Sequence, residues 1–163
     1  MKLYRISSAK YLKNMEGLGA SYQDGARWNR PGQPVIYFAL SPAVAMLEMA
    51  NYIPSPRLVP KTYRLGIYEA PDNISQLDLP EEKLPDNWSE FPYPFTTQTL
   101  GGDWLDAGEE LILLVPSVAV SGGLEKIAIL NPLHAECNQI KLVDSTVAVY
   151  NERIFSGISP KHA

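Results

Sequence analysis

The chain is poor in the residues that build covalent cross-links and metal sites. Its 163 residues include one cysteine and two histidines. A single cysteine, Cys137, excludes an internal disulfide and a cysteine-rich zinc site, and it favours a reducing, cytoplasmic compartment. His134 and His162 are too few for a histidine-rich metal site. We therefore expect a protein that works without a metal cofactor.

Long hydrophobic runs and basic tracts are also missing. No stretch approaches the ~18 apolar residues needed to cross a bilayer, and the amino terminus lacks the apolar core of a signal peptide. The net charge is −4 without a lysine–arginine tract. Direct nucleic-acid binding requires a basic face, so this balance argues against it. We predict a cytoplasmic protein that binds neither membrane nor nucleic acid directly.

Common signatures of nucleotide-binding and hydrolytic enzymes are absent as well. The sequence has no Gly-x-Gly-x-x-Gly or Walker loop, and no Gly-x-Ser-x-Gly elbow surrounds Ser117. Rossmann folds, P-loop NTPases and α/β-hydrolases are therefore excluded. Hydrophobic residues make up 45% of the chain, which is enough for a core. The length suits one domain, which we assign to residues 1–163.

The apolar segments that are present predict an α+β fold. Predicted strands cover 2–6, 26–29, 35–40, 61–69, 111–115, 127–130, 140–143 and 147–150, and predicted helices cover about 42–53 and 96–107. Residues 7–15 are a short helix or an irregular connection, and 16–25 are a loop. A long irregular excursion at 71–94 carries a helical turn near 81–84. Because strands outnumber helices without regular alternation, mixed or antiparallel sheets with flanking helices are favoured over a doubly wound sheet.

The first long helix has clear start signals. Ser41 is suited to cap its free amides, and Pro42 suits its first position. Helical spacing then predicts the buried face, and Glu48 falls outside that stripe, on a flank that borders a cleft. The predicted buried residues are Ala43, Met46, Leu47, Ala50 and Ile53.

Charge is scarce around this helix. Between positions 31 and 56 the only formal charge is Glu48, and two cations, Arg27 and Arg30, lie just upstream. An isolated carboxylate among apolar residues is costly unless it has a partner or a task. The planar fork of arginine suits phosphate or carboxylate. We interpret Arg27 as an anion ligand and Glu48 as the partner of a positive charge; a structural ion pair and a solvated flank residue are the alternatives. Arg30, before a Pro-Gly turn, is predicted to be solvated.

Two further side chains are candidates for chemistry. Tyr37 alternates with apolar neighbours on its strand, and it is either a core tyrosine with a satisfied hydroxyl or a ring that packs on a ligand base. Ser117 follows a buried strand, where ligand-binding groups often gather, although a lone serine there is also a common turn residue. Cys137 has no context that lowers its pKa, and we assign it no role.

Six short segments together resemble one known family, the RES domain, which is the toxin half of RES–Xre toxin–antitoxin pairs. They are Leu3-Tyr-Arg-Ile6, Gly25-Ala-Arg-Trp-Asn29, Val35-Ile-Tyr-Phe-Ala39, Ala45-Met-Leu-Glu48, Val115-Pro-Ser-Val118 and Leu130-Asn-Pro132. The family is named for an arginine, a glutamate and a serine, which here fall on Arg27, Glu48 and Ser117. The motif-bearing part spans about residues 3–132. The excursion at 71–94 and the tail after residue 150 add nothing to the resemblance.

The resemblance implies a fold like that of ADP-ribosyltransferases and NAD as the substrate. Members cleave the bond between nicotinamide and ribose, either depleting NAD by hydrolysis or phosphorolysis or transferring ADP-ribose to a protein. The implied partner is an Xre-type helix-turn-helix antitoxin that covers the active site, and oligomers then form through the antitoxin. A nucleotide-binding module without catalysis remains the alternative from another functional class.

Roles for individual residues follow from that chemistry. Loss of nicotinamide leaves an oxocarbenium-like ribose cation, which Glu48 would stabilise more than the ground state. Arg27 would clamp the pyrophosphate, Tyr37 would stack on nicotinamide, and Ser117 would hold the amide or ribose or orient an acceptor. A phosphorylase needs a further anion site, for which Arg30 and Arg5 are conceivable ligands. The remaining predicted binding residues are Tyr4, Arg5, Trp28, Asn29 and Asn131.

Overall fold

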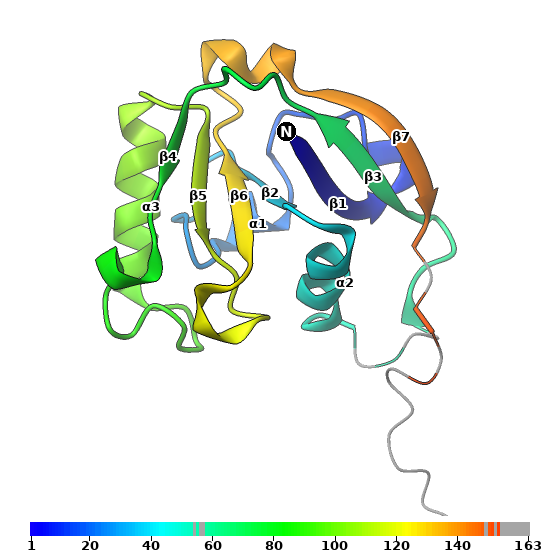
Figure 1. Ribbon diagram of the computed structural model, residues 1–163, viewed down its shortest axis with the longest axis horizontal. Helices are drawn as coiled ribbons and strands as arrows, with labels where there is room; N and C mark the ends of the chain where they lie inside the picture. The colour runs from blue at the N-terminus through cyan, green and yellow to red at the C-terminus, as the bar shows by residue number, and fades with distance from the viewer. Residues whose placement is uncertain (54, 56–57, 149, 152, 154–163) are drawn as a thin grey trace, which may run out of the picture.

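The computed structural model describes residues 1–53, 55, 58–148, 150, 151 and 153. Seven strands form one sheet in the order β4-β5-β6-β2-β1-β3-β7 (Figure 1). The strands are β1 Lys2–Ser8, β2 Ile36–Ala39, β3 Tyr63–Glu69, β4 Gln76–Asp78, β5 Ile112–Pro116, β6 Lys126–Leu130 and β7 Lys141–Val147. The α-helices are α1 Ala20–Asp24, α2 Pro42–Ala50 and α3 Phe95–Ala107. Short 3-10 turns lie at η1 Ala9–Tyr11, η3 Glu81–Lys83, η4 Ser121–Gly123 and η5 Ala135–Gln139.

The sheet is mixed, because β4 and β5 are parallel while the other neighbouring strands are antiparallel. At the centre of the sheet, β1 and β2 pair only between Tyr4 and Ala39, so this pairing is the shortest in the sheet. Helix α3 flanks the β4–β5–β6 side, and α2 packs beside the short β1–β2 pairing (Figure 1). The predicted α+β class with a mixed sheet and flanking helices is confirmed.

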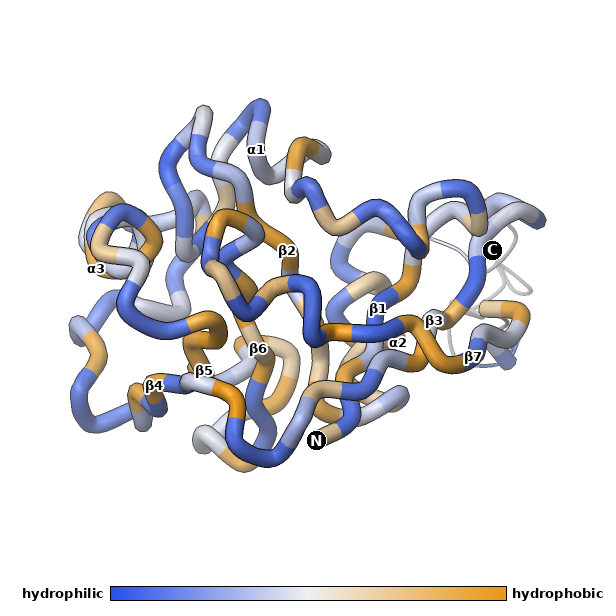
Figure 2. Tube along the Cα trace, turned by 90° about the horizontal axis from the view of Figure 1, so that it is seen from above, coloured by the Kyte–Doolittle hydropathy of each residue, from blue (hydrophilic) through white to orange (hydrophobic). Residues whose placement is uncertain are grey.

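The core lies on both faces of the sheet. Alternate residues of β2 divide between them, since Ile36 and Phe38 join one cluster while Tyr37 and Ala39 face α3 and α2. Hydrophobic colour follows β2 and β5 through the interior, and hydrophilic colour follows the outer loops (Figure 2). No helix in the described part of the chain has the length and apolar character needed to cross a bilayer.

Several predicted segments differ from the structure. Residues 26–29 are not a strand but a tight turn closed by one bridge between Ala26 and Asn29; it follows Gly25, whose φ of +75° suits glycine. The predicted loop at 16–25 contains α1, and the excursion at 71–94 contains the short strand β4 in addition to its expected turn η3. The two late strands are one, β7, and position 149 lies outside the described residues, as does His162.

Helix α2 begins as predicted but buries a different face. The Ser41 hydroxyl accepts a hydrogen bond from the Val44 amide at 3.1 Å, and Pro42 opens the helix. Within the helix the buried residues are Val44 and Ala45, whereas Ala43 and Leu47, predicted to be inside, are exposed. Ile53, just beyond the helix, is buried as predicted. The small and β-branched pair allows close approach to β1 and β2. Glu48 lies one helical turn after Val44, so its side chain is on the face of α2 that is directed toward the sheet.

Candidate functional site

A carboxylate and a hydroxyl meet where α2 passes the end of β5. Ser117 Oγ donates a hydrogen bond to Glu48 Oε1 at 2.5 Å. Ser117 is fully buried, and its Oγ also accepts a hydrogen bond from the Ala119 amide at 3.1 Å, while Glu48 is half-buried. The serine is thus fixed by backbone geometry at a strand end, and it orients one oxygen of the carboxylate.

Arg27 is held by neutral groups. Its Nη1 donates to the backbone oxygens of Trp88 at 2.5 Å and Glu90 at 2.7 Å, and its guanidinium carbon lies 5.2 Å from the ring centroid of Tyr93. Only 8% of the residue is exposed. Burial lowers the pKa of Arg27, and Tyr93 and Glu48 act in the opposite direction by favouring its charged form. Within the described residues, its Nε and Nη2 make no hydrogen bond, which leaves donors for a ligand.

Arg27 and Glu48 share one side of the sheet without forming an ion pair. Glu48 stabilises the charged form of Arg27 electrostatically, but among the described residues no Arg27 nitrogen lies within salt-bridge distance of a carboxylate. Tyr37, Tyr52 and Tyr93 lie close enough to influence the pKa of Arg27 as well. The structure thus brings together three of the predicted residues, Arg27, Glu48 and Tyr37, and Ser117 joins them through its hydrogen bond.

Tyr37 supports the turn that carries Arg27. Its hydroxyl accepts a hydrogen bond from the Trp28 amide at 3.2 Å and donates one to Asn29 Oδ1 at 2.9 Å. Burial raises the pKa of Tyr37, so the hydroxyl stays protonated and able to donate. Trp28 and Asn29 are themselves fully buried, so their side chains belong to the scaffold beneath the site and not to its surface.

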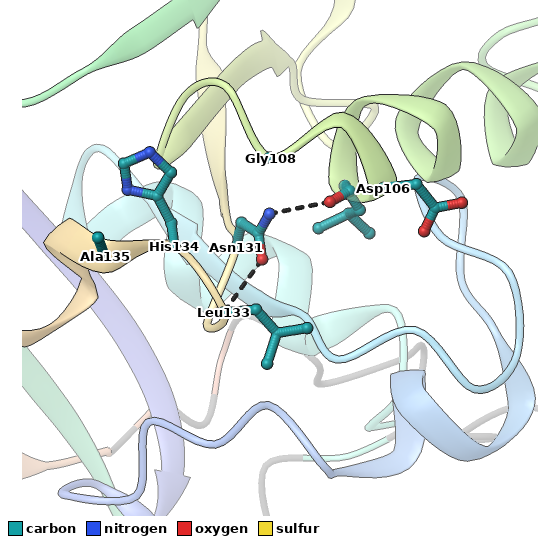
Figure 3. A pocket seen from close by; sticks show the side chains of 7 residues that line it. Asp106, Gly108, Asn131, Leu133, His134 and Ala135 are labelled. Carbon is teal, nitrogen blue, oxygen red and sulfur yellow. Dashed lines mark hydrogen bonds between the residues drawn. The ribbon is translucent and has the colours of Figure 1, made fainter.

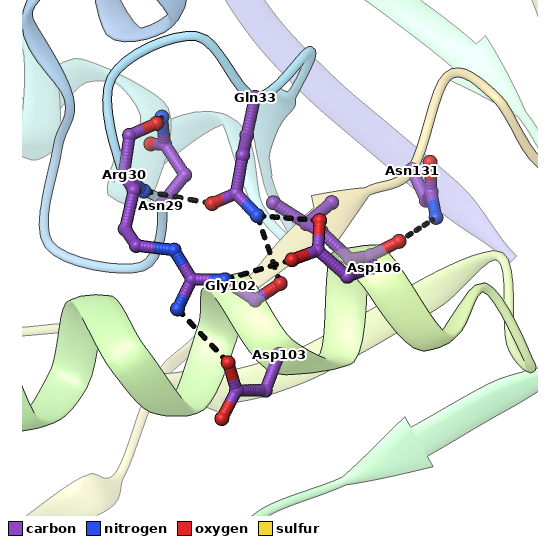
Figure 4. A network of polar contacts seen from close by, with 8 residues as sticks. Asn29, Arg30, Gln33, Gly102, Asp103, Asp106 and Asn131 are labelled. Atoms are coloured by element: carbon purple, nitrogen blue, oxygen red, sulfur yellow. Dashed lines mark hydrogen bonds and ion pairs between the residues drawn. The ribbon is translucent and has the colours of Figure 1, made fainter.

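The same turn is clamped onto α3 by an ionic network (Figure 4). Arg30 bonds Asp103 at 2.9 Å and Asp106 at 2.8 Å. Gln33 donates to Asp106 at 2.8 Å and to the Gly102 oxygen at 2.9 Å. The hydrogen bond that Arg30 donates to Asp103 is the largest of the effects that raise the pKa of Arg30. The Arg30 side chain is 32% exposed, so it is partly solvated, but its charge is already paired with two carboxylates, which disfavours it as a phosphate ligand.

Two other predicted binding residues, Tyr4 and Arg5, lie on opposite faces of β1. Tyr4 is on the α2 side of β1, packed with Ile6 and Ala39. Arg5, the next residue of the strand, points to the opposite face, where it reaches the Asn14 oxygen at 3.4 Å. There burial lowers the pKa of Arg5, against a smaller opposing effect of Tyr68, a tyrosine of the opposite-face cluster. Arg5 is therefore separated from Arg27 by the sheet.

Asn131 lies at the wrong end of the sheet for a shared site. Because β5 and β6 are antiparallel and Asn131 lies opposite Leu111, six residues before Ser117, Asn131 and Ser117 stand roughly 20 Å apart. The Asn131 amide donates to the Leu105 oxygen at 3.0 Å and accepts from the Leu133 amide at 3.1 Å. It lines a separate open pocket of about 410 Å³ together with Asp106 and His134 (Figure 3).

Sequence reasoning missed the groups that hold Arg27. Tyr52 and Tyr93 were not singled out, and the carbonyls of Trp88 and Glu90 leave no trace in a side-chain pattern. The only available signal was the length of the 71–94 excursion, since long loops in compact domains are often functional. Within the described residues, no cluster of three acidic, histidine or cysteine side chains suits a metal ion.

Comparison with known proteins gives a consistent result. The RES domain family model matches residues 2–151. A protein named Toxin Res from Pseudomonas putida is 37% identical over 143 residues, covering 87% of this chain and 92% of that protein. A Yersinia enterocolitica protein of the same name is 38% identical over 135 residues, covering 82% and 86%.

Two further similarities concern a named activity and a solved structure. The Prs ADP-ribosylating toxin of Sphingobium sp. is 31% identical over 144 residues, covering 86% of each chain. A chain in the crystal structure of the M. tuberculosis MbcT–MbcA toxin–antitoxin complex superposes with a TM-score of 0.67 at 20% identity, covering 94% of this chain and 86% of that one. The structural likeness establishes a shared fold.

Proposed function

The chain belongs to the RES domain family, and we propose that it is the toxin of a toxin–antitoxin pair that cleaves the nicotinamide–ribose bond of NAD. The observation that carries the proposal is that Glu48 lies close enough to Arg27 to favour its charged form without bonding to it, while neutral groups anchor both side chains. Neither charge is cancelled by a direct ion pair within the described residues. The charges of Arg27 and Glu48 therefore remain available to a ligand that carries an anionic group and develops positive charge near it.

NAD has those two features. Its diphosphate suits the unbonded Nε and Nη2 of Arg27, which present a planar fork. As the glycosidic bond breaks, its electron pair moves into the nicotinamide ring, which is already cationic, so no general acid is needed. The ribose carbon becomes electron-poor, and Glu48 stabilises that charge more strongly than it stabilises the ground state. Addition of water or phosphate, with loss of a proton, completes the reaction.

The other site residues serve as supports in this mechanism. Ser117 holds the Glu48 carboxylate in one orientation through the 2.5 Å hydrogen bond. Tyr37 fixes the turn of Arg27 through its own hydrogen bonds. These bonds give the Tyr37 hydroxyl a positioning role, while its half-buried ring is proposed to stack on nicotinamide.

Product analysis of NAD tests the proposal. The purified protein is incubated with NAD, with and without phosphate, and free nicotinamide and ADP-ribose products are quantified. Glu48→Gln keeps the shape but removes the charge, so we expect loss of at least 100-fold, or roughly 3 kcal/mol of transition-state stabilisation. Glu109→Gln, at an exposed glutamate beyond α3, is the matched control and keeps full turnover. No nicotinamide release by the wild type refutes the proposal.

Transfer of ADP-ribose to a protein is the second candidate. It is favoured by the 31% identity to a relative named as an ADP-ribosylating toxin. The chemistry at ribose is the same, with a protein side chain as acceptor. Mass spectrometry of lysate proteins after incubation with NAD distinguishes the two. Added ADP-ribose on a protein supports transfer, and nicotinamide release without any protein gaining mass supports simple NAD degradation.

The proposed partner is a cytoplasmic Xre-type helix-turn-helix antitoxin that covers the site. Support comes from the fold shared with a chain of a toxin–antitoxin complex. An antitoxin that docks over Arg27 and Glu48 should compete with NAD. Titrating the protein encoded beside this gene into the nicotinamide assay tests this, and undiminished turnover at saturating partner contradicts it.

A further inference from the structure

Two tyrosines beside the site are joined by their hydroxyls, and the mechanism above does not use them. The hydroxyl oxygens of Tyr52 and Tyr93 are 3.0 Å apart. Tyr52 follows the end of α2, and Tyr93 belongs to the segment that precedes α3. This tyrosine bridge, Tyr52–Tyr93, thus links two elements that are far apart in the sequence.

One end of the bridge leads to Arg27. The Tyr93 ring contacts the Arg27 guanidinium and packs edge-on against Phe91, with ring centroids 5.4 Å apart. The backbone just before it, at Trp88 and Glu90, accepts both hydrogen bonds of Arg27 Nη1. The segment 88–93 therefore surrounds the guanidinium with carbonyls on one side and a ring on another.

The other end of the bridge leads to Glu48. Tyr52 lies four residues after Glu48, and the helical turn continues to it because the Tyr52 amide donates to the Met49 oxygen at 3.0 Å. Tyr52 is 69% exposed, so its hydroxyl contact and not burial in the core fixes its ring. Partial loss of hydration and the hydrogen bond with Tyr93 raise the pKa of Tyr52; Glu48 raises it further and Arg27 lowers it. The bridge thus lies close enough to both Glu48 and Arg27 to be influenced by their charges.

We propose that the Tyr52–Tyr93 bridge sets the position of the Arg27 guanidinium relative to Glu48, and that both tyrosines are positioning residues for the diphosphate of the substrate. The inference rests on the proposed function. Arg27 has no acidic partner among the described residues to fix its rotamer, so neutral contacts must do so. A bridge that ties the helix of Glu48 to the segment around Arg27 keeps the separation of the two charges constant.

Binding of ADP, which carries the diphosphate without nicotinamide, tests the inference independently of catalysis. Tyr52→Phe and Tyr93→Phe each remove the same hydroxyl contact, so we expect each to weaken ADP binding by about twofold to tenfold in calorimetry. The double variant should be no weaker than either single one, because the same contact is lost. Tyr93→Leu also removes the ring from Arg27 and should lose about tenfold or more.

The steady-state kinetics of NAD cleavage give a second measurement. The KM for NAD should rise by the same factor as the ADP dissociation constant, while kcat stays unchanged, since a diphosphate contact is equal in the ground and transition states. Tyr11→Phe, at an exposed tyrosine of η1 away from the site, is the matched control and changes neither value.

The two proposals fail in different ways. If ADP binds and the tyrosine variants weaken it, but the wild type releases no nicotinamide, the proposed reaction is wrong and the bridge stands. If nicotinamide is released but the tyrosine variants bind ADP as tightly as the wild type, or their losses add in the double variant, the bridge is overturned. Absence of ADP binding by the wild type also overturns it, because the diphosphate site would then not exist.

Discussion

Replacing Gly101 by alanine should separate the Arg27 turn from α3. A Cβ at this position would lie 2.1 Å from the Trp28 oxygen and 2.8 Å from its carbonyl carbon. Both are backbone atoms, so no side-chain rotation relieves the clash, and the two segments must move apart. The movement would stretch the hydrogen bond from Gln98 to the Ala26 oxygen, now 3.0 Å. Arg27, next to Trp28, moves with them.

The magnitude follows from opposing effects. Alanine is favoured over glycine inside a helix by about 1 kcal/mol. Overpacking of a close contact is unfavourable by about 1–3 kcal/mol, and a weakened buried hydrogen bond adds about 1 kcal/mol. We expect a net destabilisation of about 2 kcal/mol, which lowers Tm by about 4–8 °C in a chain of this size. The displaced Arg27 should also weaken ADP binding.

Scanning calorimetry and ADP titration well below Tm measure the two effects. Gly19→Ala is the matched control, because a Cβ there would meet nothing within 4 Å and its φ is −84°. A Tm in Gly101→Ala equal to or above that of the wild type would refute the reasoning, since helix propensity alone would then decide the outcome. A lowered Tm with unchanged ADP affinity would show that the turn can shift without moving Arg27.

Three further variants test separate contacts. Ser117→Ala removes a hydrogen bond to a carboxylate, worth about 1.5–3 kcal/mol, and should lower kcat for NAD by about tenfold to 100-fold with little change in KM. Tyr37→Phe leaves the buried Asn29 oxygen without its donor and should lower Tm by about 4–8 °C, as seen in thermal melts. Glu136 accepts hydrogen bonds from the Ser75 hydroxyl and amide, which lower its pKa below the usual 4.5. The stabilisation that the Glu136 carboxylate provides is complete above pH 4.5 and is lost as the pH falls through the lowered pKa. The difference in Tm between wild type and Glu136→Gln should therefore narrow from pH 7 to pH 3.

Elements whose signals are local were predictable from the sequence. The continuous apolar runs of β2 and β5 identify buried strands because both of their faces are covered. The Ser41–Pro42 pair fixes the start of α2 by capping chemistry alone. Charge scarcity around Glu48, read together with the family motif, was sufficient to select Arg27 and Ser117, and these residues do lie around one side of the sheet.

Features set by tertiary packing were not predictable. Periodicity assigned Ala43 and Leu47 to the buried face of α2, but both are exposed, because the close approach to the sheet selects Val44 and Ala45 instead. That rotation is what brings Glu48 to Ser117. The partners of Arg27 are backbone oxygens more than 60 residues away, and any sequence supplies backbone oxygens. Only the fold decides which of them lie there.

The two arginines of one turn show why the anchors of the site are neutral. Arg30 is neutralised by Asp103 and Asp106, and its ion pairs clamp the turn to α3. Arg27, three residues earlier, is held by carbonyls and a ring, which fix its position without cancelling its charge. A carboxylate partner at Arg27 would compete with the anion that the residue is proposed to bind. An acidic partner at Arg27 would thus remove the electrostatic basis of the proposed chemistry.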